Sequence, residues 1–118
     1  MLLGDARAAI TQQSQVFTSY FPSSETSQFD AKYYGETVVP LMMKLYGSKA
    51  IRRVEVTLGQ SGQGGAKPAM VAAAHYYIRD RTAWDTAGRL AFPQLLAEGP
   101  KYTNIRPLAA DTEVSASA

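Results

Sequence analysis

MVAAAHYYI, residues 70–78, is the stretch of sequence that decides the fold. It is apolar, has the length of a strand and places its residues alternately on two faces. One face carries Val71, Ala73, His75 and Tyr77, and the other carries Met70, Ala72, Ala74, Tyr76 and Ile78. Alanine runs also suit helices, so the choice of a strand depends on the segments around it.

Three further segments have the β-branched, aromatic or alternating pattern of strands. Their ranges are 16–21, 51–58 and 102–110. The Gly-rich residues 59–68 are expected to join two of the strands as a long hairpin loop, because they lack the Gly-Lys-Ser/Thr of a phosphate loop. Pro107 has no N–H to donate, which places the last strand at a sheet edge.

Two helices are predicted between the strands. The first begins at Asp30, whose carboxylate can accept N–H groups of the first turn, and ends at Gly47. Its apolar stripe is Tyr34, Val38, Leu41 and Leu45. Pro40 lies inside this helix and is expected to kink it.

The second helix is predicted to begin at Asp80 and to carry Trp84. Pro93 is expected to start a separate short helical segment that Gly99 and Pro100 close. The order of elements is then β-α-β-β-α-β, which predicts an α+β, ferredoxin-like fold: a four-stranded antiparallel sheet with two helices on one face. We expect a second copy of the chain to cover the other face.

The 118 residues allow one domain, which we place at residues 16–110. Residues 1–15 form an N-terminal extension, read as a short helix or a loose arm. Residues 111–118 are small and polar and are expected to fray as a C-terminal tail.

Composition excludes several classes of protein. The chain has no Cys, which rules out disulfide scaffolds and thiolate metal sites, and a single His, so one subunit cannot build a multi-histidine metal site. The net charge of +2 is too small for nucleic-acid binding. No apolar run approaches the roughly 20 residues of a membrane span, and no signal peptide is recognisable, so we expect a cytoplasmic protein.

His75 is the one imidazole available for proton transfer near neutral pH. It is read either as a general acid/base facing a cavity that the neighbouring alanines leave open, or as a core or interface histidine held by a hydrogen bond. Tyr20, Tyr34, either Tyr76 or Tyr77, and Trp84 could line a pocket for an aromatic or alicyclic ligand, or could be plain core.

Three segments of the chain resemble the EthD family. They are FDAKYY at residues 29–34, followed by Pro40 and Leu41; AHYYI at residues 74–78, leading into the helix with Trp84; and KYTNI at residues 101–105, with Pro107. They follow the family's order over about residues 16–110. The resemblance implies a dimeric α+β barrel, in which two ferredoxin-like sheets pack face to face.

The same resemblance implies a cofactor-independent homodimer acting in degradation of ethyl tert-butyl ether type compounds or in aromatic polyketide metabolism. A hydrophobic small molecule would bind between sheet and helices, with His75 as candidate acid/base for a dehydration or decarboxylation and Val38 among the ligand contacts. The family commonly has a His where this chain has Val38, which favours a non-catalytic binding or accessory protein as the alternative. Haem with His75 as axial ligand would need more room than alanines on one strand provide.

Overall fold

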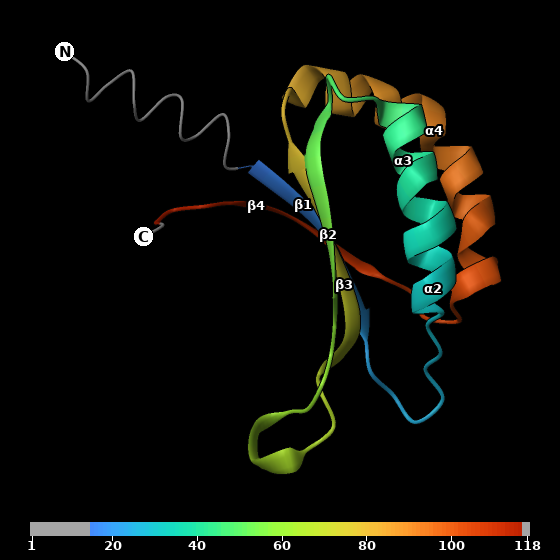
Figure 1. Cartoon of the computed structure of the whole chain (residues 1–118), viewed down its shortest axis with the longest axis vertical. Helices are drawn as coiled ribbons and strands as arrows, with labels where there is room; N and C mark the ends of the chain where they lie inside the picture. Colours follow the sequence, from blue (N-terminus) through green and yellow to red (C-terminus); the bar gives the residue numbers. More distant parts are fainter. Residues whose placement is uncertain (1–14, 117–118) are drawn as a thin grey trace.

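β3 (Met70–Ile78) and β1 (Gln15–Pro22) pair antiparallel at the centre of a four-stranded sheet in the computed structural model, which describes residues 15–116. β2 (Ile51–Leu58) and β4 (Leu108–Glu113) are the edges, in the order β2-β3-β1-β4. The α-helices of the described residues lie on one side of the sheet, and a short 3-10 helix, η2 (Gln63–Gly65), lies in the loop between β2 and β3 (Figure 1). The predicted α+β, ferredoxin-like architecture is confirmed. The helix predicted in the N-terminal extension lies outside the described residues, apart from Gln15, which opens β1.

The first helical segment begins as predicted. It consists of α2 (Ala31–Tyr33), a π-helical turn η1 (Tyr34–Val38) and α3 (Val39–Tyr46). Asp30 accepts the Tyr33 N–H at 2.9 Å, and the rings of Phe29 and Tyr34 lie 5.5 Å apart as a hydrophobic staple over the first turn. Gly47 ends the segment with φ of 83°, a conformation that favours glycine.

The π-helical turn corrects the predicted stripe. The Val39 N–H bonds to the Tyr34 carbonyl, one residue further back than in an α-helix. The wider turn makes Met42 the third buried residue after Tyr34 and Val38, whereas Leu41 and Leu45 are half-buried. Pro40 follows this turn near the start of α3, where a missing N–H costs less than it would inside an unbroken α-helix.

The second helix is longer than predicted. Asp80 caps it, accepting the Ala83 N–H at 2.9 Å, but α4 (Arg81–Tyr102) continues through Pro93 and Pro100 rather than dividing at Pro93. Figure 1 shows α4 bending part-way along before it runs beside α3. A proline in the middle of a helix removes one main-chain bond and produces a bend of this kind.

The last strand is displaced from its prediction of residues 102–110. Tyr102 still belongs to α4, and β4 starts only after Pro107, so this proline precedes the edge strand instead of lying within it. β4 extends to Glu113, into the segment expected to fray, and a bidentate pair between Arg81 and Asp111, at 3.1 and 3.2 Å, ties it to α4.

The β2–β3 connection is the expected long hairpin loop, and it projects from one end of the sheet (Figure 1). Its first glycine is required by packing. A Cβ on Gly59 would lie 1.9 Å from the Met70 carbonyl oxygen, so no larger residue fits where the loop leaves the sheet.

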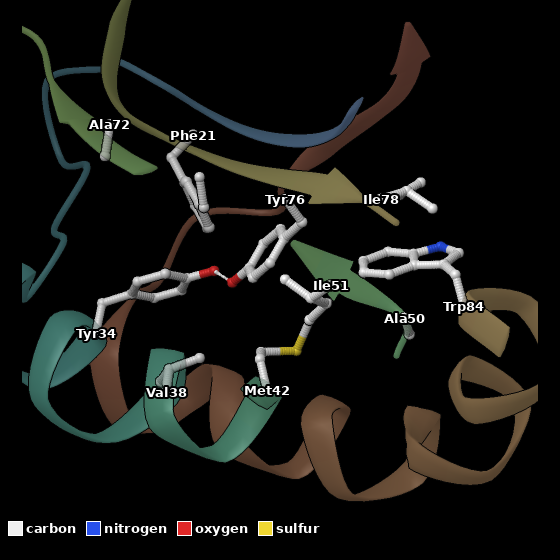
Figure 2. Packing of buried hydrophobic residues seen from close by; sticks show 11 residues of the cluster. Phe21, Tyr34, Val38, Met42, Ala50, Ile51, Ala72, Tyr76, Ile78 and Trp84 are labelled. Carbon is white, nitrogen blue, oxygen red and sulfur yellow. Dashed lines mark hydrogen bonds between the residues drawn. The ribbon is translucent and has the colours of Figure 1, made fainter. Parts of the chain in front are cut away.

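The hydrophobic core lies between the sheet and the helices (Figure 2). The sheet contributes Phe21, Ala72, Ala74, Tyr76 and Ile78, and the helical segments contribute Tyr34, Val38, Met42 and Trp84. The face of β3 that carries Tyr76 therefore points toward the helices, and the face that carries His75 points away from them.

Candidate functional site

The hydroxyl groups of Tyr34 and Tyr76 meet in the core between η1 and β3 (Figure 2). Tyr34 is 3% exposed and Tyr76 is 2% exposed, so the contact is shielded from water. One hydrogen bond between two hydroxyls uses one of their two hydrogens, which leaves the other free for a further acceptor. The pair is thus a buried hydrogen-bond donor in apolar surroundings.

Burial raises the pKa of both phenols above the ordinary tyrosine value. For Tyr76 the neighbouring Tyr34 raises the pKa further. Both groups therefore remain protonated at neutral pH. They can donate hydrogen bonds or act as weak acids, but they are not bases.

Aromatic rings surround this pair. Phe21 and Tyr102 lie edge-on to Tyr34, with ring centroids at 6.1 and 5.0 Å, and Trp84 lies 6.0 Å from Tyr76. Edge-on contacts of this kind are the preferred geometry for a flat aromatic ligand as well. The π-helical turn that carries Tyr34 is itself a rare element that occurs frequently at functional sites.

A surface groove reaches the edge of this cluster. It has a volume of about 390 Å³ and is lined by Phe29, Asp30, Lys101, Tyr102 and Asn104 among others. The rings of Phe29 and Tyr102 both touch Tyr34. A second groove, of about 510 Å³, lies between the end of α3 and the first half of α4, with Leu45, Ala87 and Leu90 in its walls.

His75 lies on the other face of the sheet. Its Nδ1 is 3.1 Å from the hydroxyl of Thr18 on β1, and its Nε2 is 3.2 Å from the hydroxyl of Thr57 on β2. Thr18 is 1% exposed, although it lies on the face without helices. Both ring nitrogens thus have partners from the neighbouring strands.

Tyr77 belongs to a charged cluster on the same face. Its hydroxyl donates to Glu55 at 2.7 Å, and the guanidinium of Arg53 lies 4.1 Å from the centre of its ring. Arg53 and Glu55 also form an exposed ion pair at 3.2 Å. The hydrogen bond to Glu55 raises the pKa of Tyr77.

The structure therefore divides the predicted site residues between two faces of the sheet. Tyr34, Val38 and Trp84 come together in the core on the helix side. Tyr20, His75 and Tyr77 lie on the opposite face; Tyr20 pairs with Ala73 in the sheet register. The expectation that His75 faces the space between sheet and helices is wrong, because residues that alternate along a strand point to opposite sides and Tyr76 takes the helix side.

The sequence left Tyr76 and Tyr77 open as alternatives for the pocket, and the structure places Tyr76 in the core on the helix side. Thr18 and Thr57 could be found only through the strand register, which the sequence does not give. Within residues 15–116, no group of three His, Cys, Asp or Glu side chains could hold a metal ion. No helix in the same range is long and apolar enough to cross a membrane.

No protein-family model and no curated protein sequence matches the chain, but two solved structures do. An EthD-like protein from Ralstonia eutropha JMP134 is 26% identical, with a TM-score of 0.81 over 90% of this chain and 96% of that chain. An EthD family protein from Bacillus halodurans C-125 is 14% identical, with a TM-score of 0.51 over 80% of this chain and 96% of that chain. The second match is a likeness of fold alone.

Proposed function

The chain has the fold of the EthD family, and from this premise we propose that it binds a small hydrophobic, oxygen-bearing molecule between its sheet and its helices. The buried hydroxyl pair of Tyr34 and Tyr76 carries this proposal. The ligand's oxygen accepts the hydrogen that the pair leaves free, and its apolar body packs against the aromatic rings around them.

The chemistry of the pair limits the ligand class. Two protonated phenols donate to a carbonyl, phenolic or ether oxygen, and the dry surroundings strengthen that bond. An aromatic ketone, as in a polyketide, and a branched ether both have such an oxygen. A carboxylate or phosphate would enter this core at a large desolvation cost without a cation to pair with.

The ligand enters from the groove at Phe29 and Tyr102, whose rings separate it from Tyr34. Tyr102 is half-buried and ends α4, so a shift of this ring opens the core with little disturbance to the sheet.

Whether the bound molecule reacts depends on the same tyrosines. In a dehydration or decarboxylation they stabilise negative charge on the ligand's oxygen, as an oxyanion hole does. His75 is separated from them by the sheet and takes no part within one subunit. The alternative is a binding or accessory protein that uses the same pocket without chemistry.

We further propose that the chain is a homodimer that covers the face of the sheet opposite the helices. That face carries the apolar side chains Val16, Tyr20, Ala73, Leu108 and Ala110. Leu108 is 57% exposed there. In this arrangement His75, held by Thr18 and Thr57, is an interface residue.

Fluorescence of Trp84, the single tryptophan, provides the test. We expect 2-acetonaphthone to quench it saturably, and Tyr34→Phe to weaken this ligand about three- to tenfold, the value of one hydrogen bond. Naphthalene, which has no oxygen, should bind both proteins equally. Tyr20→Phe, on the other face, is the matched control. If Tyr34→Phe and Tyr20→Phe weaken the binding of 2-acetonaphthone equally, or if this ligand does not quench Trp84 at all, the proposal is contradicted.

A further inference from the structure

Six aromatic rings form an unbroken path through the protein on the helix side of the sheet. In order they are Tyr46, Trp84, Tyr76, Tyr34, Tyr102 and Tyr33. Ring centroids are 4.4 Å apart for Tyr46 and Trp84, and 6.0 Å apart for Trp84 and Tyr76. Beyond the hydroxyl contact between Tyr76 and Tyr34, ring centroids are 5.0 Å apart for Tyr34 and Tyr102, and 6.5 Å apart for Tyr102 and Tyr33. Electrons pass readily between rings in contact.

One end of the path has a proton acceptor. The Tyr33 hydroxyl donates to Glu98 Oε1 at 2.9 Å, and Lys101 Nζ donates to Glu98 Oε2 at 2.9 Å. The hydrogen bond from Lys101 is the main reason that the pKa of Glu98 is lowered, so this carboxyl is ionised at neutral pH. Tyr33 is half-buried and stacks on Tyr102, with an angle of 17° between the rings.

We propose that this path carries one-electron oxidation from Trp84 to Tyr33, so that damage by radicals leaves the buried tyrosine pair intact. A peroxyl-type radical in the shallow surface groove that Trp84 lines with Gly88 and Phe92 removes an electron from the indole and takes up its N–H proton, which gives the hydroperoxide. Tyr33 then returns an electron to Trp84 through the intervening rings and gives its phenolic proton to Glu98. Trp84 recovers a proton from water, which leaves a neutral indole, a Tyr33 phenoxyl radical and a protonated Glu98. A soluble thiol reduces the phenoxyl radical by donating a hydrogen atom.

The oxidation stops at Tyr33 because a phenol must lose its proton when it is oxidised. Of the tyrosines on the path, Tyr33 is the one whose hydroxyl donates to a carboxylate within the described residues. Among the described residues, the hydroxyls of Tyr34 and Tyr76 hydrogen-bond to each other, and burial holds their protons in place. Tyr46 is half-buried, and burial raises its pKa as well.

Pulse radiolysis of the full chain with azide radicals, which oxidise tryptophan in preference to tyrosine, tests the path. Since the chain has a single Trp, the tryptophanyl absorption reports on Trp84 alone. We expect it to decay while tyrosyl absorption rises, at a rate independent of protein concentration. Tyr33→Phe should slow this step about tenfold or more, equivalent to ~1.4 kcal/mol in the barrier.

Two further variants separate the path from general effects on the fold. Glu98→Gln keeps every ring but removes the carboxylate that accepts the Tyr33 proton. Electron transfer from Tyr33 to Trp84 should therefore be slower in this variant as well. Tyr77→Phe is the matched control, because Tyr77 also donates to a carboxylate but lies on the other face of the sheet. The proposal is overturned if the rate of electron transfer to Trp84 is unchanged in Tyr33→Phe or Glu98→Gln, or if it falls equally in Tyr77→Phe. It is also overturned if this rate is proportional to protein concentration.

Discussion

Thr18 and His75 bind each other across the two central strands, with the threonine hydroxyl 3.1 Å from the imidazole Nδ1. On the other side of the ring, the Thr57 hydroxyl donates to the Ala73 carbonyl at 3.5 Å and lies 3.2 Å from Nε2. A hydroxyl that donates its hydrogen elsewhere accepts from the imidazole, so this network favours the tautomer with the hydrogen on Nε2. Thr18 then donates to Nδ1.

Thr18→Val should destabilise the protein by about 1–3 kcal/mol, because it preserves the shape of the side chain but leaves a ring nitrogen of the half-buried His75 without its donor. Thr57→Val, at an exposed position, should cost less than about 1 kcal/mol, since water can replace its hydroxyl. Urea denaturation of both variants measures the difference. Equal losses would mean that the two sides of the imidazole are equivalent.

Asp80→Ala should lower the free energy of unfolding by about 1 kcal/mol, because the Ala83 N–H at the start of α4 loses its acceptor. Asp80→Asn should cost much less, since asparagine is an equally good N-cap. Thermal denaturation compares the two variants. A loss as large in the asparagine variant would assign the effect to charge rather than to the cap.

Pro40→Ala should change the free energy of unfolding by less than about 1 kcal/mol and yet alter the pocket. The new N–H can bond to the Glu36 carbonyl, which favours an α-helical turn over the π-helical one and rotates Tyr34 away from Tyr76. Aromatic NOEs between the two tyrosines should weaken, and 2-acetonaphthone should bind less tightly. Unchanged NOEs would show that the π-helical turn does not depend on the proline.

Glu98 should make stability depend on pH in acid. Its pKa is lowered in the folded protein, mainly by the hydrogen bond from Lys101, so it contributes stability above its unfolded pKa that is lost as the pH falls through the folded pKa. Glu98→Gln should therefore show a smaller loss of stability between neutral and acidic pH. Urea midpoints measured across that range provide the comparison, and parallel curves for the two proteins would contradict it.

The sequence predicted the order of strands and helices because caps and alternation are local signals. Asp30, Gly47 and Asp80 act at helix ends where predicted. The π-helical turn was missed because a helical pattern assumes a constant period, and one extra residue changes which side chain is buried from Leu41 to Met42. The end of α4 was missed because packing holds the helix together through prolines that would break it locally.

The site was only partly predictable for a different reason. Alternation along β3 correctly separates His75 from Tyr76, but both faces mix alanine with aromatic residues. The pattern therefore could not decide which face the helices cover. Only the packing of Tyr34 and Trp84 against Tyr76 settles the orientation.

Leu108→Lys should convert the proposed homodimer into a monomer. Leu108 is 57% exposed on β4, beside Tyr20 on the face without helices, and a lysine in a face-to-face sheet interface would bury an unpaired charge. Leu90→Lys is the matched control, because Leu90 is 83% exposed but lies on α4, on the helix side. Sedimentation at micromolar concentration should give twice the mass of 12.8 kDa for the unmodified chain and for Leu90→Lys, and the single mass for Leu108→Lys. A monomeric unmodified chain rules out the dimer, and a monomeric Leu90→Lys places the interface on α4 instead of the sheet.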